Sequence, residues 1–304
     1  MAIIVDERTR VVVQNATGNQ GRFHLAQMKA YGTHVMCGVA PGKGGQEIEG
    51  LPVYDTVEQA VLHHGVNASV SFVPAAFAKD AAFEAIDAGL AVVVIITEHI
   101  PVHDEMDIMC FARSRGATVV GPNTFGVISP GKAKLGIMPA VAYTPGPVGI
   151  VARSGTLSYE IASALTRAGL GQSTVVGLGG DRVVGLNFVE VLKKFEEDEE
   201  TRACVLVGEI GGTAEEEAAE FIKGMTKPVV AYLAGRSAPP GKRMGHAGAI
   251  IERGRGSFEG KVKALEAAGV RVAGLPWEVA GLVREVLGVE EGGDSRGEHA
   301  SDAP

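Results

Sequence analysis

One histidine lies in a stretch whose residue types could support a chemical step. Residues 242–251 read KRMGHAGAII, so His246 stands between small side chains and a large phosphorylated ligand could approach its ring. Backbone N–H groups in such a glycine-rich loop can receive phosphate oxygens. A lone histidine is usually structural, so a nucleophilic role depends on which groups the fold brings to His246.

Two further polar positions follow strand-like runs in the same half of the chain. Glu209 ends one apolar run and Ser154 follows another, just before an expected helix. Parallel strands present their carboxyl ends at one edge of a sheet, where ligands bind. Glu209 can there accept one ring N–H of His246 and favour the positive charge that develops as the other nitrogen attacks. Ser154 or Thr156 can cap the helix, whose N-terminus suits an anion, although capping needs no ligand.

The amino-terminal segment VVVQNATGNQGRFHLAQ (11–27) has the features of a phosphate-binding turn. A strand ending at Gln14, a turn of small residues and a helix beginning near Arg22 would aim backbone N–H groups outward. Asn15 stands where a first glycine is usual, and asparagine tolerates a left-handed backbone better than most residues. A plain tight turn between strand and helix is the alternative.

The next strand end indicates which nucleotide the turn would suit. An NAD site needs an acidic residue about 20 positions after the glycine turn, and Lys43 stands there instead. A cation suits a phosphorylated ribose, as in coenzyme A or NADP. Pro74, in FVPAAF (72–77), ends a further strand and could stack on an adenine ring. Seen singly, Lys43 is more commonly a solvated loop charge and Pro74 a turn former.

Strand-like and helix-like segments alternate along the chain, which predicts an α/β fold with parallel sheets. The expected strands cover residues 10–14, 33–39, 68–73, 91–97 and 118–121, and then 148–152, 173–178, 203–208, 228–234 and 270–274. A loop rich in Pro and Gly, 121–147, interrupts the alternation. We therefore expect a first domain at 1–146 that includes this loop, a second doubly wound domain at 147–288 and a disordered tail at 289–304.

Composition limits the class of protein. The 304 residues suffice for two domains, and a net charge of -8 argues against nucleic acid as the main partner. Cys37, Cys110 and Cys204 lack metal-type spacing, and the most apolar run, 91–97, is far shorter than the ~20 residues of a membrane helix. These features favour a cytoplasmic protein, or one of the mitochondrial matrix in a eukaryote, with no metal site and no membrane partner.

Several motifs together resemble one known family. RSGTLSYE (153–160), GLGGD (177–181), GEIGG (208–212) and GKRMGHAGAII (241–251), with GIMP and TPGPVGI before them, are similar to the α subunit of succinyl-CoA synthetase, also called succinate-CoA ligase. The resemblance extends from about residue 4 to residue 287. It implies a Rossmann-like CoA-binding domain followed by a flavodoxin-like ligase domain, in an enzyme of the tricarboxylic acid cycle.

The resemblance also implies roles for individual residues. His246 would be transiently phosphorylated, Glu209 would steady the phosphohistidine, and Ser154 and Gly155 would hold the phosphoryl group. Coenzyme A would contact Thr17, Gly18, Asn19, Gln20, Gly21, Lys43, Val73, Pro74, Thr97 and Glu98. A β subunit, in an αβ or α2β2 assembly, would carry ATP or GTP with Mg²⁺ on a nucleotide-grasping domain. Phosphate would pass through the histidine to an acyl phosphate, which CoA would convert reversibly to a thioester.

Four residues depart from the family pattern. Thr124 and Phe125 stand where cysteine and proline are common, Arg182 where proline is common, and His99 where glycine is common. The departures leave the acyl substrate open, so a malate-CoA or citrate-CoA ligase is an alternative. A non-catalytic CoA-binding protein would carry no phosphate on His246. A further alternative, an NADP-dependent oxidoreductase, would suit Lys43 but would not explain the loop that contains His246.

Overall fold

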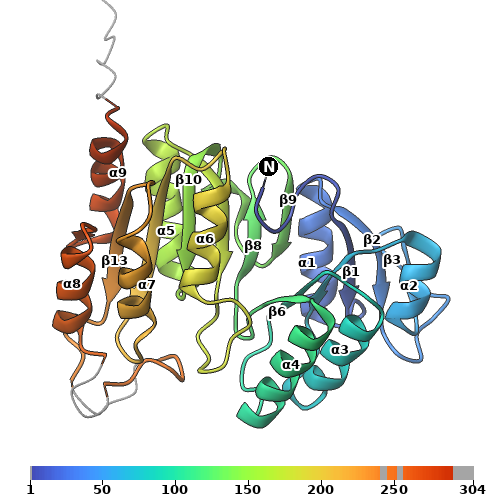
Figure 1. Cartoon of the computed structure of the whole chain (residues 1–304). Coiled ribbons are helices and arrows are strands. Elements are labelled where there is room, and N and C mark those ends of the chain that lie inside the picture. Colours follow the sequence, from blue (N-terminus) through green and yellow to red (C-terminus); the bar gives the residue numbers. More distant parts are fainter. Residues whose placement is uncertain (1, 240–244, 252–255, 290–304) are drawn as a thin grey trace, which may run out of the picture.

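The computed structural model describes residues 2–239, 245–251 and 256–289, which form two seven-stranded sheets lying side by side (Figure 1). Helices flank both sheets, so the predicted α/β class with two doubly wound units is confirmed. Residues 242–244 of the predicted histidine loop, and the predicted tail from 290 onward, lie outside the described residues.

The first sheet has a Rossmann-like arrangement. Its strands lie in the order β3 (Glu47–Ile48), β4 (Leu51–Tyr54), β2 (His34–Val39), β1 (Arg10–Gln14), β5 (Ala68–Ser71), β6 (Val92–Ile95) and β7 (Thr118–Val120). All are parallel to their neighbours except β3, which pairs antiparallel with β4. Helices α2 (Val57–His64), α3 (Ala75–Asp87) and α4 (Val102–Arg115) pack on one face, and α1 (Asn19–Ala30) lies on the other. The strand order reverses between β1 and β5, the position where such sheets bind ligands.

The second sheet contains a flavodoxin-like arrangement. Its strands lie in the order β14 (Arg271–Ala273), β13 (Val229–Ala234), β12 (Ala203–Glu209), β10 (Pro145–Ala152), β11 (Gln172–Gly177), β8 (Gly126–Ser129) and β9 (Ala133–Gly136). The first five are parallel, and their order reverses at β10. Helices α6 (Phe188–Glu197), α7 (Ala214–Ile222) and α8 (Phe258–Ala267) cover one face, and α5 (Gly155–Arg167) and α9 (Val279–Leu287) the other (Figure 1). Two short 3-10 helices, η1 (Ala140–Ala142) and η2 (Pro276–Glu278), pack against α5.

Continuous burial explains why the strands could be read from the sequence. Every residue of β12 is buried, as are the last four residues of β1. Strands covered on both faces by helices need apolar residues at every position rather than at alternate ones. The helix boundaries were less accurate, because α1 begins at Asn19, with Gly18 as its N-cap, and not near Arg22 as predicted.

The segment 121–147 is not the plain loop that its Pro and Gly content indicated. It contains β8 and β9, which form an antiparallel pair, and β8 hydrogen-bonds to β11 of the second sheet. These strands are four residues long, too short for a clear sequence pattern. The short strands β3 and β4 were missed for the same reason. The predicted division at residue 146 thus assigns β8 and β9 to the first domain, whereas their hydrogen bonds join them to the second sheet.

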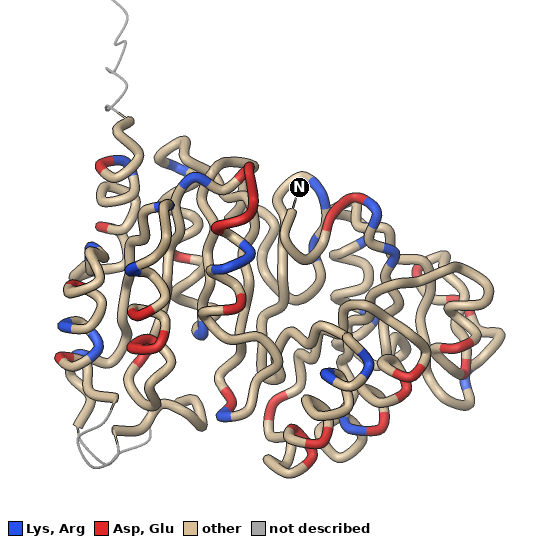
Figure 2. The backbone as a smooth tube through the Cα atoms, viewed as in Figure 1, with Lys and Arg blue, Asp and Glu red and all other residues tan. Residues whose placement is uncertain are grey.

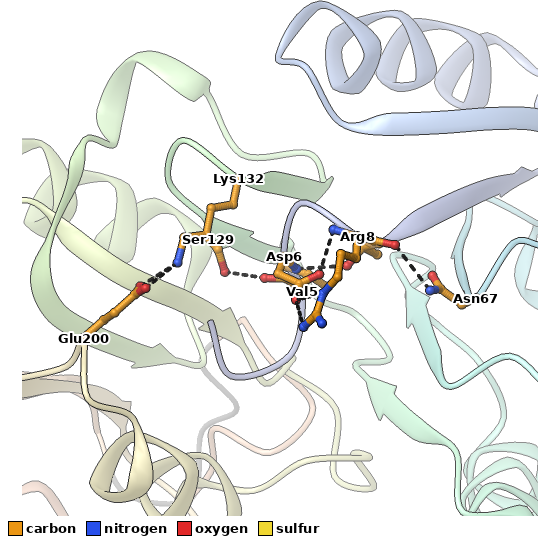
Figure 3. A network of polar contacts seen from close by, with 8 residues as sticks. Val5, Asp6, Arg8, Asn67, Ser129, Lys132 and Glu200 are labelled. Carbon is orange, nitrogen blue, oxygen red and sulfur yellow. Dashed lines mark hydrogen bonds and ion pairs between the residues drawn. The ribbon is translucent and has the colours of Figure 1, made fainter. Parts of the chain in front are cut away.

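Polar contacts and a shared core join the two units. The Ser129 hydroxyl donates to the Val5 carbonyl at 2.8 Å, and Asp6 and Arg8 order the turn that leads from there into β1 (Figure 3). Within the second unit, Lys132, in the turn after β8, pairs with Glu200 at 2.6 Å (Figure 3). Helix α1 packs on β9, and a single apolar cluster contains residues of both sheets. The two sheets are therefore fixed relative to each other.

The charges lie mainly on the helices and outer turns, while the strands are almost free of them (Figure 2). Across the described parts of the chain, no helix is both long and apolar enough to cross a lipid bilayer.

Candidate active site

His246 lies in the loop that follows β13, and its ring is held by Glu209 at the end of β12. The ring Nδ1 lies 2.8 Å from Oε2 of Glu209, the distance of a charge-assisted hydrogen bond. When Nδ1 donates its proton to this carboxylate, Nε2 keeps a free lone pair. The imidazole is 31% exposed, so the ring is accessible, as a nucleophilic role requires.

Glu209 also sets the charge preference of the ring. Its hydrogen bond is the largest influence on the ring and raises the pKa of His246 above the usual 6.5, against the opposing effects of burial and of the Arg153 cation. Glu209 itself is buried, and its Oε1 has no hydrogen-bond partner within the described residues. The carboxylate is therefore directed at the histidine and favours the imidazolium-like charge of a substituted ring.

The loop between β11 and α6 forms another wall around the ring. A Cβ on Gly180 would lie 2.5 Å from the imidazole carbons, so a residue without a side chain is needed here. Arg182 donates from Nε to the Ala247 carbonyl at 3.2 Å and so ties this loop to the histidine loop. The departure from proline at position 182 thus has a structural role beside the site.

Helix α5 begins at the same edge of the sheet. Ser154 is its N-cap, and the hydroxyl accepts a hydrogen bond from the Leu157 N–H at 3.5 Å. Ser154, Gly155 and Thr156 line the cavity that also contains His246. The free N–H groups of the first turn can therefore bind an anion beside the imidazole.

This cavity, of about 690 Å³, lies between the two units and is called the central cavity here. Its lining includes eight of the predicted site residues: Gln20, Val73, Pro74, Thr97 and Glu98 from the first unit, and Ser154, Gly155 and His246 from the second. The structure thus brings five of the ten predicted CoA contacts, together with Ser154, Gly155 and His246, to one cavity. The volume is in the range of small-molecule sites.

A second cavity, of about 830 Å³, lies within the first unit. Val73 and Pro74 line both cavities, so a long ligand could extend from one into the other. The lining of the second cavity also includes three acidic residues, Asp55, Asp80 and Glu84. Lys43 is exposed in the turn after β2 and does not line this cavity, although its neighbour Gly42 does.

The glycine turn before α1 has the predicted left-handed residue. Asn15 has φ 59°, and its side-chain amide donates to the Phe72 carbonyl at 2.9 Å. A Cβ on Gly21 would lie 2.1 Å from the Asn15 carbonyl oxygen, so Gly21 lets the helix pack closely on the turn. Within this segment, the predicted contacts Thr17, Gly18, Asn19 and Gly21 shape the turn, and only Gln20 among the predicted residues lines the central cavity.

Arg153 and Tyr159 are among the residues of the central cavity that sequence reasoning missed. Arg153 lies between two carboxylates, with Nη1 3.9 Å from Oε1 of Glu209 and Nε 4.0 Å from Oε1 of Glu215. Tyr159 stacks edge to face on Phe125 at 5.6 Å between ring centroids. Both belong to the RSGTLSYE motif, which could have indicated them.

The remaining departures are also placed by the structure. Thr124 and Phe125 are buried and line the central cavity, and the Thr124 hydroxyl donates to the Gly177 carbonyl at 2.7 Å. His99 has φ 65°, a left-handed conformation that explains why glycine is common at this position.

Comparison with known proteins identifies the family. Residues 6–99 match the CoA binding domain family, and residues 151–271 match the CoA-ligase family. The chain is 64% identical over 287 residues to the succinate-CoA ligase (ADP-forming) subunit alpha 2 of Archaeoglobus fulgidus, covering 94% of this chain and 100% of that one. It is 53% identical over 286 residues to the alpha subunit from Staphylococcus aureus, covering 94% and 95%. The chain belongs to the succinate-CoA ligase α-subunit family.

A solved structure agrees with this membership. A mutant ATP citrate lyase from Methanosaeta concilii, in complex with citryl-CoA, superposes with a TM-score of 0.84 at 25% identity over 96% of this chain and 52% of that longer one. As a succinate-CoA ligase α subunit, the chain is a CoA ligase whose first unit binds CoA, and the α designation implies a β partner. The predicted family, fold and enzyme class are confirmed, and the malate-CoA, citrate-CoA and non-catalytic alternatives are not favoured.

Proposed function

We propose that His246 is the phosphoryl carrier of a succinate-CoA ligase, with Nε2 as the nucleophile. The observation that supports this most directly is the 2.8 Å contact between Nδ1 and Glu209, because it leaves Nε2 free in a ring that lines the central cavity. The N-terminus of α5, in the same cavity, would bind the phosphoryl oxygens through Ser154 and Gly155.

The reaction divides into three displacements. Nε2 attacks the terminal phosphorus of a nucleoside triphosphate, a P–N bond forms and the diphosphate leaves. A succinate carboxylate oxygen then attacks the same phosphorus, the P–N bond breaks and an acyl phosphate forms. The CoA thiolate attacks the acyl carbon and inorganic phosphate leaves. A covalent histidine intermediate replaces one difficult step with easier ones.

Glu209 contributes through charge and through orientation. As Nε2 becomes bonded to phosphorus, the ring gains positive charge, and the carboxylate at Nδ1 stabilises it. The same carboxylate keeps the proton on Nδ1, so the nucleophilic lone pair stays on the nitrogen that an incoming phosphoryl group can reach.

The first unit would hold CoA along the two cavities. The thiol end would reach the central cavity near Thr97 and Glu98, and the nucleotide end would lie in the second cavity, past Pro74. The turn at 17–21 and Lys43 would receive phosphates of the ligand. Lys43 forms no ion pair with any described residue, and its exposed turn adjoins the second cavity.

The nucleotide would come from the partner. A β subunit would carry ATP or GTP with Mg²⁺, in an αβ or α2β2 assembly, and would deliver the terminal phosphate to His246. In the described part of the chain, no group of three His, Cys, Asp or Glu side chains could hold a metal ion. The named relatives come from archaea and a bacterium, and we place the protein in the cytoplasm.

Reconstitution with the β subunit tests the function. The complex is supplied with CoA, ATP or GTP, Mg²⁺ and either succinate, malate or citrate, and thioester formation is followed. We expect succinate to give the highest kcat/KM and His246→Asn to abolish turnover, while the matched change His103→Asn, at an exposed site on α4, leaves it intact. Thioester formation by His246→Asn at the wild-type rate would overturn the proposal.

A further inference from the structure

A buried ion pair is connected to the histidine site through residues that contact Glu209. Lys261 of α8 is fully buried, and its ammonium group pairs with Oε2 of Glu215, which lies in the first turn of α7 and is also fully buried. Glu216 adds a second carboxylate 3.4 Å from the same ammonium. Neither Lys261 nor Glu215 lines the central cavity.

Glu215 connects this pair to the site by two routes. Its Oε1 accepts a hydrogen bond from the backbone N–H of Glu209 at 3.1 Å. The same oxygen lies 4.0 Å from Nε of Arg153, whose Nη1 lies 3.9 Å from Oε1 of Glu209. Positive and negative groups therefore alternate from α8 to the imidazole, in the order Lys261, Glu215, Arg153, Glu209, His246.

The end of β12 is shaped to fit Glu215. A Cβ on Gly208 would lie 2.7 Å from Cγ and Oε1 of Glu215, so glycine is needed for the carboxylate to press against the strand immediately before Glu209. The direction of the Glu209 side chain depends on this backbone and on Arg153. Glu215 contacts both the backbone N–H of Glu209 and the Arg153 guanidinium, and Lys261 pairs with Glu215.

Stability alone is a weak reason for such an arrangement. Replacing a buried ion pair with apolar residues of similar size is often neutral or stabilising, because desolvation of both charges offsets their attraction. A buried pair that fixes the direction of a neighbouring charge has a different use, since a misdirected carboxylate no longer supports its partner.

We infer that Lys261 and Glu215 are positioning residues for phosphoryl transfer, which hold Glu209 and Arg153 so that the Glu209 carboxylate meets Nδ1 of His246. The inference rests on the proposed role of His246. Without the buried pair, Arg153 would turn toward Glu209 and neutralise it, and the ring would lose its anionic partner.

The test uses the α subunit with its β partner and the variants Lys261→Met and Lys261→Arg. Lys263→Met is the matched control, because Lys263 lies on the same helix but is exposed. Two quantities are measured: the rate of phosphohistidine formation from ATP, and the pKa of His246 by NMR of histidine-labelled protein. We expect Lys261→Met to slow phosphorylation at least 10-fold, because Glu215 loses the partner that fixes its position, and we expect Lys261→Arg to restore much of the rate. Lys263→Met should change neither the rate nor the pKa of His246.

A second variant covers the case in which Lys261→Met does not fold. Lys261→Met/Glu215→Gln removes both buried charges, so it avoids an unpaired buried ion. We expect it to fold with slow phosphorylation and a lowered pKa of His246. A folded variant with the wild-type rate and wild-type pKa would overturn the inference. If the wild-type complex itself forms no phosphohistidine, the proposed function fails instead, and the pKa measurement still tests the positioning.

Discussion

At the scale of single residues, the candidate site combines a partly exposed imidazole with a buried carboxylate that contacts it. Glu209 acts on the imidazole from behind, while the cavity side of the ring stays open. Two acidic residues near this site, Glu105 and Asp181, are not used by the proposed chemistry. Glu105, on α4 of the first unit, is buried and contacts Asp181, in the loop that also packs on His246.

Burial and the neighbouring Asp181 raise the pKa of Glu105 to about 8, so the folded protein retains a proton on this carboxyl that the unfolded chain loses near 4.5. The other polar groups facing the pair are the Asn123 amide, the Val183 N–H and, beyond Asp181, the His246 ring. Because the pKa is raised by folding, the stabilising contribution is complete below pH 4.5 and is lost as the pH rises to about 8.

Glu105→Gln therefore gives a pH-dependent change in stability. Glutamine keeps a donor toward Asp181 at every pH. The free energy of unfolding of the variant should therefore exceed that of the wild type by roughly 1–3 kcal/mol at pH 9 and equal it near pH 5. Urea unfolding at the two pH values measures this difference. A constant difference at both pH values would contradict the proton that the folded protein retains on Glu105.

At the scale of elements, the strands could be predicted because their sequence is apolar at nearly every position. The predicted site residues could be placed at strand ends for the same reason, since parallel strands end at one edge. The RSGTLSYE motif contains Arg153, but the positioning roles of Arg153 and Glu215 could not be assigned in this way. Their roles depend on contacts with Glu209 across a strand and a helix, and no local pattern encodes those contacts.

The backbone after β6 offers a test at this scale. His99 has φ 65°, and the Nε2 of its exposed side chain lies 3.6 Å from Oε1 of Glu98. Because glycine adopts this conformation without a Cβ penalty, His99→Gly should raise the free energy of unfolding by about 0.5–1 kcal/mol. Thermal unfolding measures the change. A loss of stability would show that the His99 side chain contributes more than its conformation costs.

At the scale of the whole molecule, the two units share one core. The pairing of β8 and β9 with the second sheet, and the packing of α1 on β9, were not visible in the sequence because each depends on residues far apart in the chain. This shared core also fixes the central cavity, whose walls come from both units.

A shared core predicts that the units unfold together. Calorimetry of the α subunit should show one transition, and CoA, although it contacts the first unit, should raise the melting temperature of the whole chain. Ser129→Ala, which removes the hydrogen bond to Val5, should lower stability by about 1 kcal/mol without splitting the transition. Two separate transitions, with only one shifted by CoA, would show independent domains.

The central claim is that Nε2 of His246 carries the phosphoryl group while Glu209 supports Nδ1. The most direct measurement is incubation of the αβ complex with ATP labelled at the γ-phosphate, followed by acid and base treatment and peptide mapping. We predict acid-labile, base-stable label on the peptide that contains His246, none in His246→Asn, and formation at least 10-fold slower in Glu209→Gln, which keeps the hydrogen bond but not the charge. Label on any other residue, or full labelling of His246→Asn, would contradict the account.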